Sequence, residues 1–127
     1  MQSNKKIVLL AIVAAALVLG ACRTATLQNV NDAPVGVETM EQAREAIMRA
    51  GAGLGWEMNP QDEGHIEATL RVRDHMAKVD IMYDTDSYDI IYKDSENLRY
   101  DGDKIHQNYN GWIQNLRRDI NNEMRLM

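Results

Sequence analysis

The chain contains no phenylalanine and a single cysteine among its 127 residues. One cysteine cannot form an internal disulfide, so the chain lacks the disulfide framework that stabilises many small exported domains. Only 6% of the residues are aromatic. Trp56, Trp112 and the tyrosines must therefore supply the large side chains of the core.

Serine is also scarce, which bears on catalysis. After the N-terminal segment only Ser87 and Ser95 remain. Both lie in turn-like stretches, and neither is flanked by the glycines of a nucleophile elbow. The glycine-rich residues 51–55 follow a predicted helix instead of opening one, which excludes a dinucleotide-binding loop. We therefore expect no enzymatic activity.

Basic residues are outnumbered, with 14 lysines and arginines against 19 acidic residues and a net charge of −5. Loss of Lys5 and Lys6 with a cleaved leader leaves 12 against 19, a net charge of −7. This acidity argues against nucleic acid as a partner and against broad electrostatic attachment to anionic lipid head groups.

Residues 1–21 have the pattern of a secretory signal peptide. Their 13-residue apolar run is too short for a comfortable membrane span, which needs about 20 residues. The alternative is an uncleaved anchor with an incidental cysteine. The pattern consists of a basic start, an apolar run and small residues before Cys22: Lys5 and Lys6, residues 7–19, and Gly20 and Ala21.

The tetrapeptide LGAC at residues 19–22 resembles a bacterial lipobox. The resemblance implies cleavage between Ala21 and Cys22, a diacylglycerol on the Cys22 thiol and a fatty acid such as palmitate on the new amine. Two or three acyl chains hold a protein firmly to a bilayer. In the enterobacterial sorting pattern, Asp after the cysteine retains a lipoprotein in the inner membrane. Arg23 at this position therefore implies the outer membrane, with the protein facing the periplasm.

Residues 23–37 are polar, weakly patterned and contain Pro34 and Gly36. With Cys22 they are predicted to form a flexible tether (22–37) that spans at most about 50 Å. The alternative is a short ordered arm that packs on the domain. A single domain is expected over residues 38–127.

A first helix is predicted after Thr39, which has capping-box spacing to Gln42. Gly51 is its expected C-cap. One apolar face follows at helical spacing: Met40, Ala43, Ile47 and Ala50.

Apolar and polar residues then alternate with a period of two, which predicts half-buried strands. The short connections favour antiparallel hairpins. A final helix is expected from Asp103 or Lys104, with Gly111 inside it and close to the sheet. The prediction is an α+β fold of two layers: an antiparallel sheet of three to four strands, with an N-terminal and a C-terminal helix packed on one face. The predicted strands cover residues 56–59, 66–73, 77–84 and 88–93.

Three longer segments carry a second resemblance: GHIEATLRVRDHMAKVDIMY, YDIIYKDSENLRYD and IHQNYNGWIQNLRRDI. They are similar to a group of small Gram-negative envelope lipoproteins. The resemblance implies an envelope location and this fold, and it implies no active site.

Asp101, Asp103 and His106 are weak candidates for metal ligands near the start of the last helix. The alternative is that an aspartate caps that helix. Residues 84–89 faintly resemble a calcium loop, but they lack its glycine and terminal glutamate and are predicted to form a turn. No cofactor is expected.

Arg71 and Arg73 are expected on the outer face of the sheet, across from Lys78. Such a cationic strip suits a carboxylate or a phosphate of peptidoglycan or lipopolysaccharide. The alternative is cross-strand ion pairing, which is more common. We expect a non-catalytic binding module whose partner is an envelope protein or a cell-wall polymer. A small metal-dependent envelope enzyme and an inhibitor of a periplasmic hydrolase are the alternatives.

Overall fold

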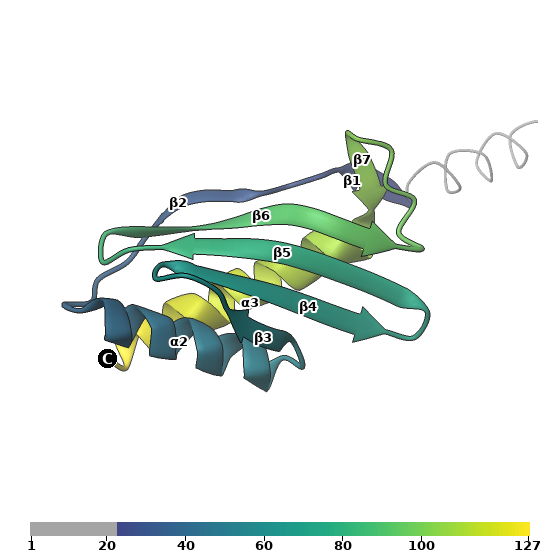
Figure 1. The fold of residues 1–127 in the computed structure, drawn as a ribbon. Helices are drawn as coiled ribbons and strands as arrows, with labels where there is room; N and C mark the ends of the chain where they lie inside the picture. The colour runs from purple at the N-terminus through teal and green to yellow at the C-terminus, as the bar shows by residue number, and fades with distance from the viewer. Residues whose placement is uncertain (1–22) are drawn as a thin grey trace, which may run out of the picture.

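The computed structural model describes residues 23–127 (Figure 1). The predicted signal peptide and Cys22 lie outside these residues. None of the helices described is long and apolar enough to cross a membrane. The elements are β1 (Thr24–Thr26), β2 (Val30–Pro34), α2 (Met40–Gly53), β3 (Glu57–Pro60), β4 (His65–Val72), β5 (His75–Tyr83), β6 (Ser87–Glu96), β7 (Lys104–His106) and α3 (Gln107–Arg125).

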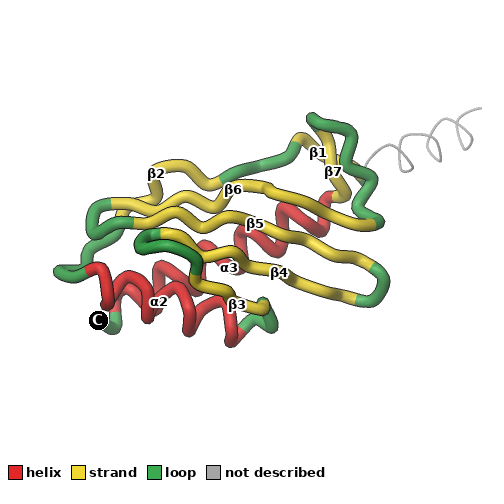
Figure 2. Tube along the Cα trace, viewed as in Figure 1, coloured by secondary structure: helices red, strands yellow, loops and turns green. Residues whose placement is uncertain are grey.

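The main sheet has five antiparallel strands in the order β2-β6-β5-β4-β3. The four predicted strands correspond to β3 to β6, and β2 adds a fifth at the edge. A separate two-stranded sheet pairs β1 with β7. The α+β class is confirmed, and the predicted count of three to four strands is wrong. Figure 2 shows the long strands running between the two ends of the molecule, with both helices on the same side of the sheet.

The start of α2 is the predicted one. The Thr39 side chain accepts a hydrogen bond from the Gln42 backbone N–H at 3.1 Å, and the Gln42 side chain accepts one from the Thr39 N–H at 3.2 Å. This reciprocal capping box satisfies two backbone donors that the first helical turn would otherwise leave unpaired.

The predicted end of α2 is wrong. The helix continues to Gly53, and the Leu54 N–H closes it on the carbonyls of Ala50 and Gly51. Gly51 is buried inside the helix, where an added Cβ would overlap the Met58 side chain of β3. Glycine serves here for close helix-to-strand packing and not as a cap.

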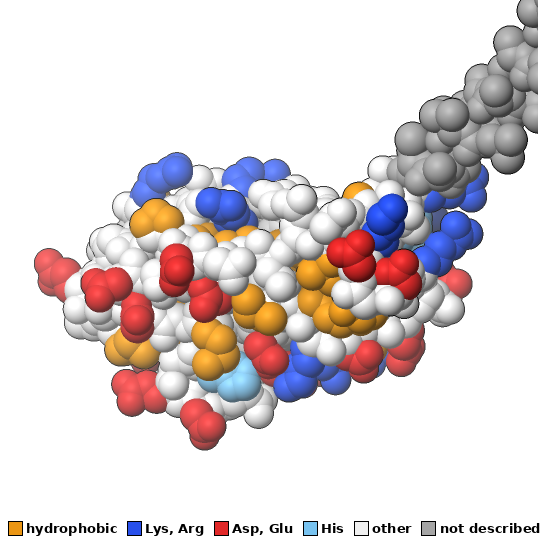
Figure 3. Space-filling model, turned by 90° about the horizontal axis from the view of Figure 1, so that it is seen from above, with side chains coloured by type: hydrophobic (Ala, Val, Ile, Leu, Met, Phe, Trp, Pro, Cys, Tyr) orange, Lys and Arg blue, Asp and Glu red, His pale blue; other side chains and the backbone are white. Residues whose placement is uncertain are grey.

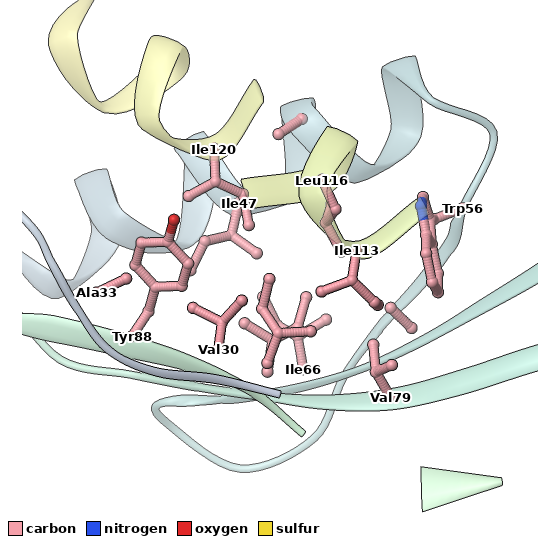
Figure 4. Packing of buried hydrophobic residues seen from close by; sticks show 14 of the residues in the cluster. Val30, Ala33, Ile47, Trp56, Ile66, Val79, Tyr88, Ile113, Leu116 and Ile120 are labelled. Atoms are coloured by element: carbon pink, nitrogen blue, oxygen red, sulfur yellow. The ribbon is translucent and has the colours of Figure 1, made fainter. Parts of the chain in front are cut away.

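The alternation in β4 and β5 directs one set of side chains toward the helices, as predicted. Ile66 faces Ile81, and Ala68 faces Val79, and all four side chains are 0% exposed. Figure 4 shows Ile66 and Val79 on the side of the sheet that faces the helices. The helical members of the cluster include Ala43, Ile47, Ile113, Leu116 and Ile120.

Tyr88 occupies the space that a phenylalanine would fill in many cores. Its ring is 1% exposed, and its hydroxyl donates to Asn121 Oδ1 at 2.6 Å. Burial raises the pKa of Tyr88 to about 12. Tyrosine therefore joins β6 to α3 through both apolar contact and a hydrogen bond. Trp56 is buried as predicted, whereas Trp112 packs only partly against the core.

The predicted flexible tether is wrong for residues 24–34, which form β1 and β2. Val30 and Ala33 are buried opposite Ile90 and Tyr88 of β6. The Asn110 side chain of α3 fixes the connection, because it donates to the Thr26 carbonyl and accepts from the Gln28 N–H. The alternative of an ordered arm describes these residues. Their strands are hard to predict because their partners lie more than 50 positions away and the pattern is broken by a bulge and by Pro34.

The start of the last helix also differs from the prediction. Residues 104–106 pair as β7, and α3 begins at Gln107 with His106 as its N-cap. Gly111 does not lie against the sheet, since it is exposed and an added Cβ would meet nothing within 4 Å. The cost of glycine in a helix is therefore not offset by packing at this position.

Gly111→Ala is expected to raise the free energy of unfolding by about 1 kcal/mol, because alanine loses less backbone entropy on helix formation. Gly51→Ala is the matched control: it gives the same propensity gain but forces Met58 to move, so it should stabilise less or destabilise. Urea unfolding followed by circular dichroism measures both. Equal stabilisation by the two substitutions would contradict the close packing of α2 on β3.

Candidate interaction surface

The outer face of the main sheet is the set of β4, β5 and β6 side chains that point away from the helices. Alternation and register define its members. Among residues 23–127 no helix or strand lies over this face (Figure 2). Its members are His65, Glu67, Thr69, Arg71, Met76, Lys78, Asp80, Met82, Asp89, Ile91, Lys93, Asp94 and Glu96.

Five of these side chains form a charge cluster across three strands. Glu67 and Asp80 face each other on β4 and β5. Lys93 Nζ lies 2.7 Å from Glu67 Oε2 and 3.4 Å from Asp80 Oδ1, and Lys78 Nζ lies 3.7 Å from Glu67 Oε1. His65 Nε2 is 2.7 Å from Asp80 Oδ1. Opposed carboxylates would repel each other, and the lysines between them turn this position into an attractive one.

The cluster lowers the pKa values of its carboxyl groups. The hydrogen bond from Lys93 lowers the pKa of Glu67. Partial burial raises the pKa of Asp80, but hydrogen bonds from His65 and Lys93 and the charge of Lys93 together outweigh it and lower that pKa. The Lys93 ammonium has a raised pKa, chiefly because of its hydrogen bond to Glu67. The charge cluster therefore holds its lysines and carboxylates as mutually neutralising pairs.

The three predicted cations do not form one free strip. Arg71 lies on the outer face, exposed and opposite Met76, and within residues 23–127 it makes no ion pair. Arg73 occupies the turn between β4 and β5 with φ 58°, so the prediction that it continues the strand is wrong. Lys78 is on the face but pairs with Glu67. The alternative of cross-strand ion pairing describes Lys78.

Apolar side chains flank the charge cluster toward the β5–β6 turn. Met82 is 43% exposed, which makes it one of the more exposed large apolar residues of the described chain. Ile91 on β6 lies diagonally beside it and is half-buried. The face thus combines an apolar margin with prepaired charges, a composition found in protein–protein interfaces.

Hydrogen bonds within the fold occupy the weak metal candidates. Asp101 Oδ1 accepts from the backbone N–H groups of Asp103 and Lys104, which lowers the pKa of Asp101. His106 Nδ1 accepts a hydrogen bond from the Asn108 N–H and so caps α3; the alternative of an aspartate cap is wrong. Within residues 23–127 no three metal-ligating side chains converge.

The predicted turn lies at residues 84–86, and residues 87–89 already belong to β6. Asp84 Oδ1 accepts from the backbone N–H groups of Asp86 and Ser87 at 2.7 and 2.8 Å, and these bonds lower the pKa of Asp84. The carboxylate is used to shape the β5–β6 turn.

Sequence reasoning missed a depression of about 410 Å³ at this end of the molecule. Acidic side chains of the β3–β4 turn and of the β5–β6 hairpin line it together with Met40 and Met82. They are Glu63, Asp84 and Asp89. The sequence shows that these turns are acidic. The register of β4 to β6 decides that they lie close together beside the start of α2.

A tyrosine cluster was also missed. The rings of Tyr92 and Tyr100 have centroids 4.2 Å apart, and Tyr109 meets Tyr92 edge-on at 5.7 Å. Tyr109 is 0% exposed, and its hydroxyl has no hydrogen-bond partner within the described chain. Burial raises the pKa of the Tyr109 hydroxyl. Tyr100, by contrast, is 42% exposed. No spacing rule joins these three positions, because they come from β6, a loop and α3.

Comparison of the chain with protein-family models, curated proteins and solved structures gives no match. The site must therefore be assigned from its own geometry.

Asp80 is expected to make the fold sensitive to acid. Because the folded state holds its pKa below the unfolded value of about 3.9, the stabilisation is present above that pH. It is lost as the pH falls through the lower folded value. Asp80→Asn should flatten the decline in unfolding free energy below about pH 4. Urea titrations across this range measure the change.

Asp86→Asn is the matched control, since the exposed Asp86 carboxylate makes no hydrogen bond or ion pair in the described chain. An equal flattening in both variants would mean that the charge cluster adds nothing specific to acid stability.

Proposed function

We propose that this protein is a lipoprotein of the outer membrane, anchored through Cys22 and facing the periplasm, that binds another envelope protein through the outer face of its sheet. The role is that of a binding module and not of an enzyme. The observation that carries the proposal is an uncovered sheet face on which prepaired charges border the exposed Met82 and the half-buried Ile91.

The anchor part of the proposal rests on the lipobox pattern at residues 19–22. The ordered domain begins at once after it, because Thr24 already pairs with His106. A lipoprotein needs only this arrangement: a processed cysteine followed by a domain that folds without the leader.

The pairing of charges favours a protein over an anionic polymer. Lys78 and Lys93 already contact Glu67 and Asp80, so their charges are not free for a phosphate or carboxylate of a cell-wall polymer. A prepaired cluster loses less on burial than an isolated charge would. Met82 and Ile91 add the apolar contact that such an interface needs.

Cys22→Ser is expected to abolish both acylation and cleavage. In cells labelled with an alkyne analogue of palmitate, the wild-type protein should carry label and lack residues 1–21 by intact mass spectrometry. The serine variant should be unlabelled and retain them. An unlabelled wild-type protein that keeps its leader would replace the lipoprotein interpretation by the uncleaved anchor.

The partner-binding surface is tested by site-specific photo-crosslinking in intact cells. A photoreactive residue at position 82 should give one discrete crosslinked product, because Met82 lies on the outer face. The same residue at Leu126, which is 78% exposed near the end of the chain, is the matched control. Ile91→Asp should weaken the product at position 82 about tenfold or more, since a buried charge opposes an apolar contact.

Identical products from positions 82 and 126 would contradict the assignment of the outer face. A product at position 82 that Ile91→Asp leaves unchanged would do the same. Circular dichroism of the Ile91→Asp protein verifies that the fold is intact.

A further inference from the structure

The lipidation of Cys22 in the proposed function has a geometric consequence at the place where the described chain begins. Arg23 is not part of a loose linker, because its carbonyl accepts a hydrogen bond from the Gln107 N–H at 3.0 Å. The following residues are held by β7 and by the Leu27 N–H, which donates to the Asp103 carbonyl at 2.9 Å. The ordered domain therefore starts one residue after the anchor.

Covalent geometry limits the distance between lipid and domain. Consecutive Cα atoms lie about 3.8 Å apart, so Cys22 Cα stays within about 4 Å of Arg23 Cα. Acyl chains on Cys22 must enter the bilayer at that point. The predicted reach of about 50 Å does not exist for an arm that is paired to the domain.

Three segments meet at this anchored end, which lies on the right in Figure 1. The His106 N–H donates to the Leu98 carbonyl at 2.7 Å, which joins β7 to the loop after β6. Asn97 in turn donates to the Asp74 carbonyl at 2.8 Å, and His75 Nδ1 lies 2.7 Å from the Asn97 carbonyl. The β1–β7 pair, the loop at 97–103 and the turn at 73–74 thus form one surface.

Exposed charges are distributed unevenly between this surface and the opposite end. At the anchored end the exposed cations lie among a similar number of exposed acidic side chains: Arg23, Arg73, Arg99 and Lys104 beside Asp74, Glu96, Asp101 and Asp103. At the opposite end acidic side chains predominate, Arg44 is paired with Glu41, and Arg125 lies beside Pro34 and Gly36. Figure 3 shows acidic side chains gathered there, on the left. They are Asp32, Glu38, Glu41, Asp62, Glu63, Asp84 and Asp86.

An exposed aromatic ring lies at the anchored end as well. Tyr100 is 42% exposed, follows Arg99 directly and stacks on Tyr92. Tyrosine is enriched at the level of lipid head groups, where its ring and hydroxyl meet apolar and polar surroundings.

We propose that the anchored end docks on the phospholipid leaflet, with Arg23, Arg99, Lys104 and Tyr100 at the head groups and the acidic end pointing away. The uneven distribution of acidic residues favours this orientation, because an anionic leaflet repels the acidic end more strongly than the anchored end. The nine residues of β5 run from His75 at the leaflet to Tyr83, about 30 Å away. The outer face of the sheet then stands sideways to the membrane, open to a partner.

The test uses the acylated protein in vesicles of phosphatidylethanolamine and phosphatidylglycerol. Acylation consumes the thiol of the one cysteine, so an introduced cysteine can be labelled uniquely with a fluorophore. Gln107→Cys places it beside the anchor, and Gln61→Cys places it in the turn at the acidic end. Both positions are exposed, and both substitutions leave the charge of the protein unchanged. Lipids with a nitroxide on the head group then quench by proximity.

Quenching at position 107 is expected to exceed that at position 61 several-fold. A flexible ten-residue Gly/Ser insert between Cys22 and Arg23 should reduce the difference. Replacement of Arg99 and Lys104 by glutamine should also lower quenching at position 107, and more so at low salt. Equal quenching at both positions, or none at either, in protein whose acylation is verified by intact mass overturns the docking proposal alone. A mass without acyl chains overturns the anchor itself and the docking with it.

Discussion

One apolar face of an antiparallel sheet must be covered, and every other feature of this protein depends on how that requirement is met. The inner faces of β4, β5 and β6 are completed by α2 and α3, which pack side by side on them. Both helices are used on this side. The opposite face therefore carries mainly polar and charged side chains, with Met82 and Ile91 among them, and within the described chain no helix covers it.

Ion pairs within the outer face compensate the repulsion between its carboxylates. Glu67 and Asp80 are directly opposite each other, an arrangement that alone would destabilise the strand pair. The alternation of β6 places Lys93 on the same face, where its ammonium contacts both carboxylates. The same interactions that stabilise the sheet reduce its attraction for free anions, so the surface is better suited to a protein than to a charged polymer.

The N-terminal arm, residues 24–34, joins the proposed anchor at Cys22 to the main sheet. β2 completes the edge of the main sheet, and β1 is fixed by β7 and by the Asn110 side chain. An anchor attached to such an arm transmits orientation as well as attachment. If the acyl chains lie at Cys22, the axis of the strands and the position of the outer face are both set relative to the membrane, and the uneven distribution of acidic residues acts in the same direction.

The sequence by itself determined the elements whose signals are local: the capping box of Thr39 and Gln42, the alternation in β3 to β6, the apolar stripe of α3 and hence the α+β class. It also contains the tetrapeptide LGAC, which resembles a lipobox. Only the tertiary structure decided the rest. β1, β2 and β7 are too short and irregular to be recognised without their distant partners, and Gly51 and Gly111 reversed their expected roles because contacts with other elements decide what a glycine does. The sequence identifies three cations near this face: Arg71, Arg73 and Lys78. Register and turn geometry determine which of them lie on the face and which is paired.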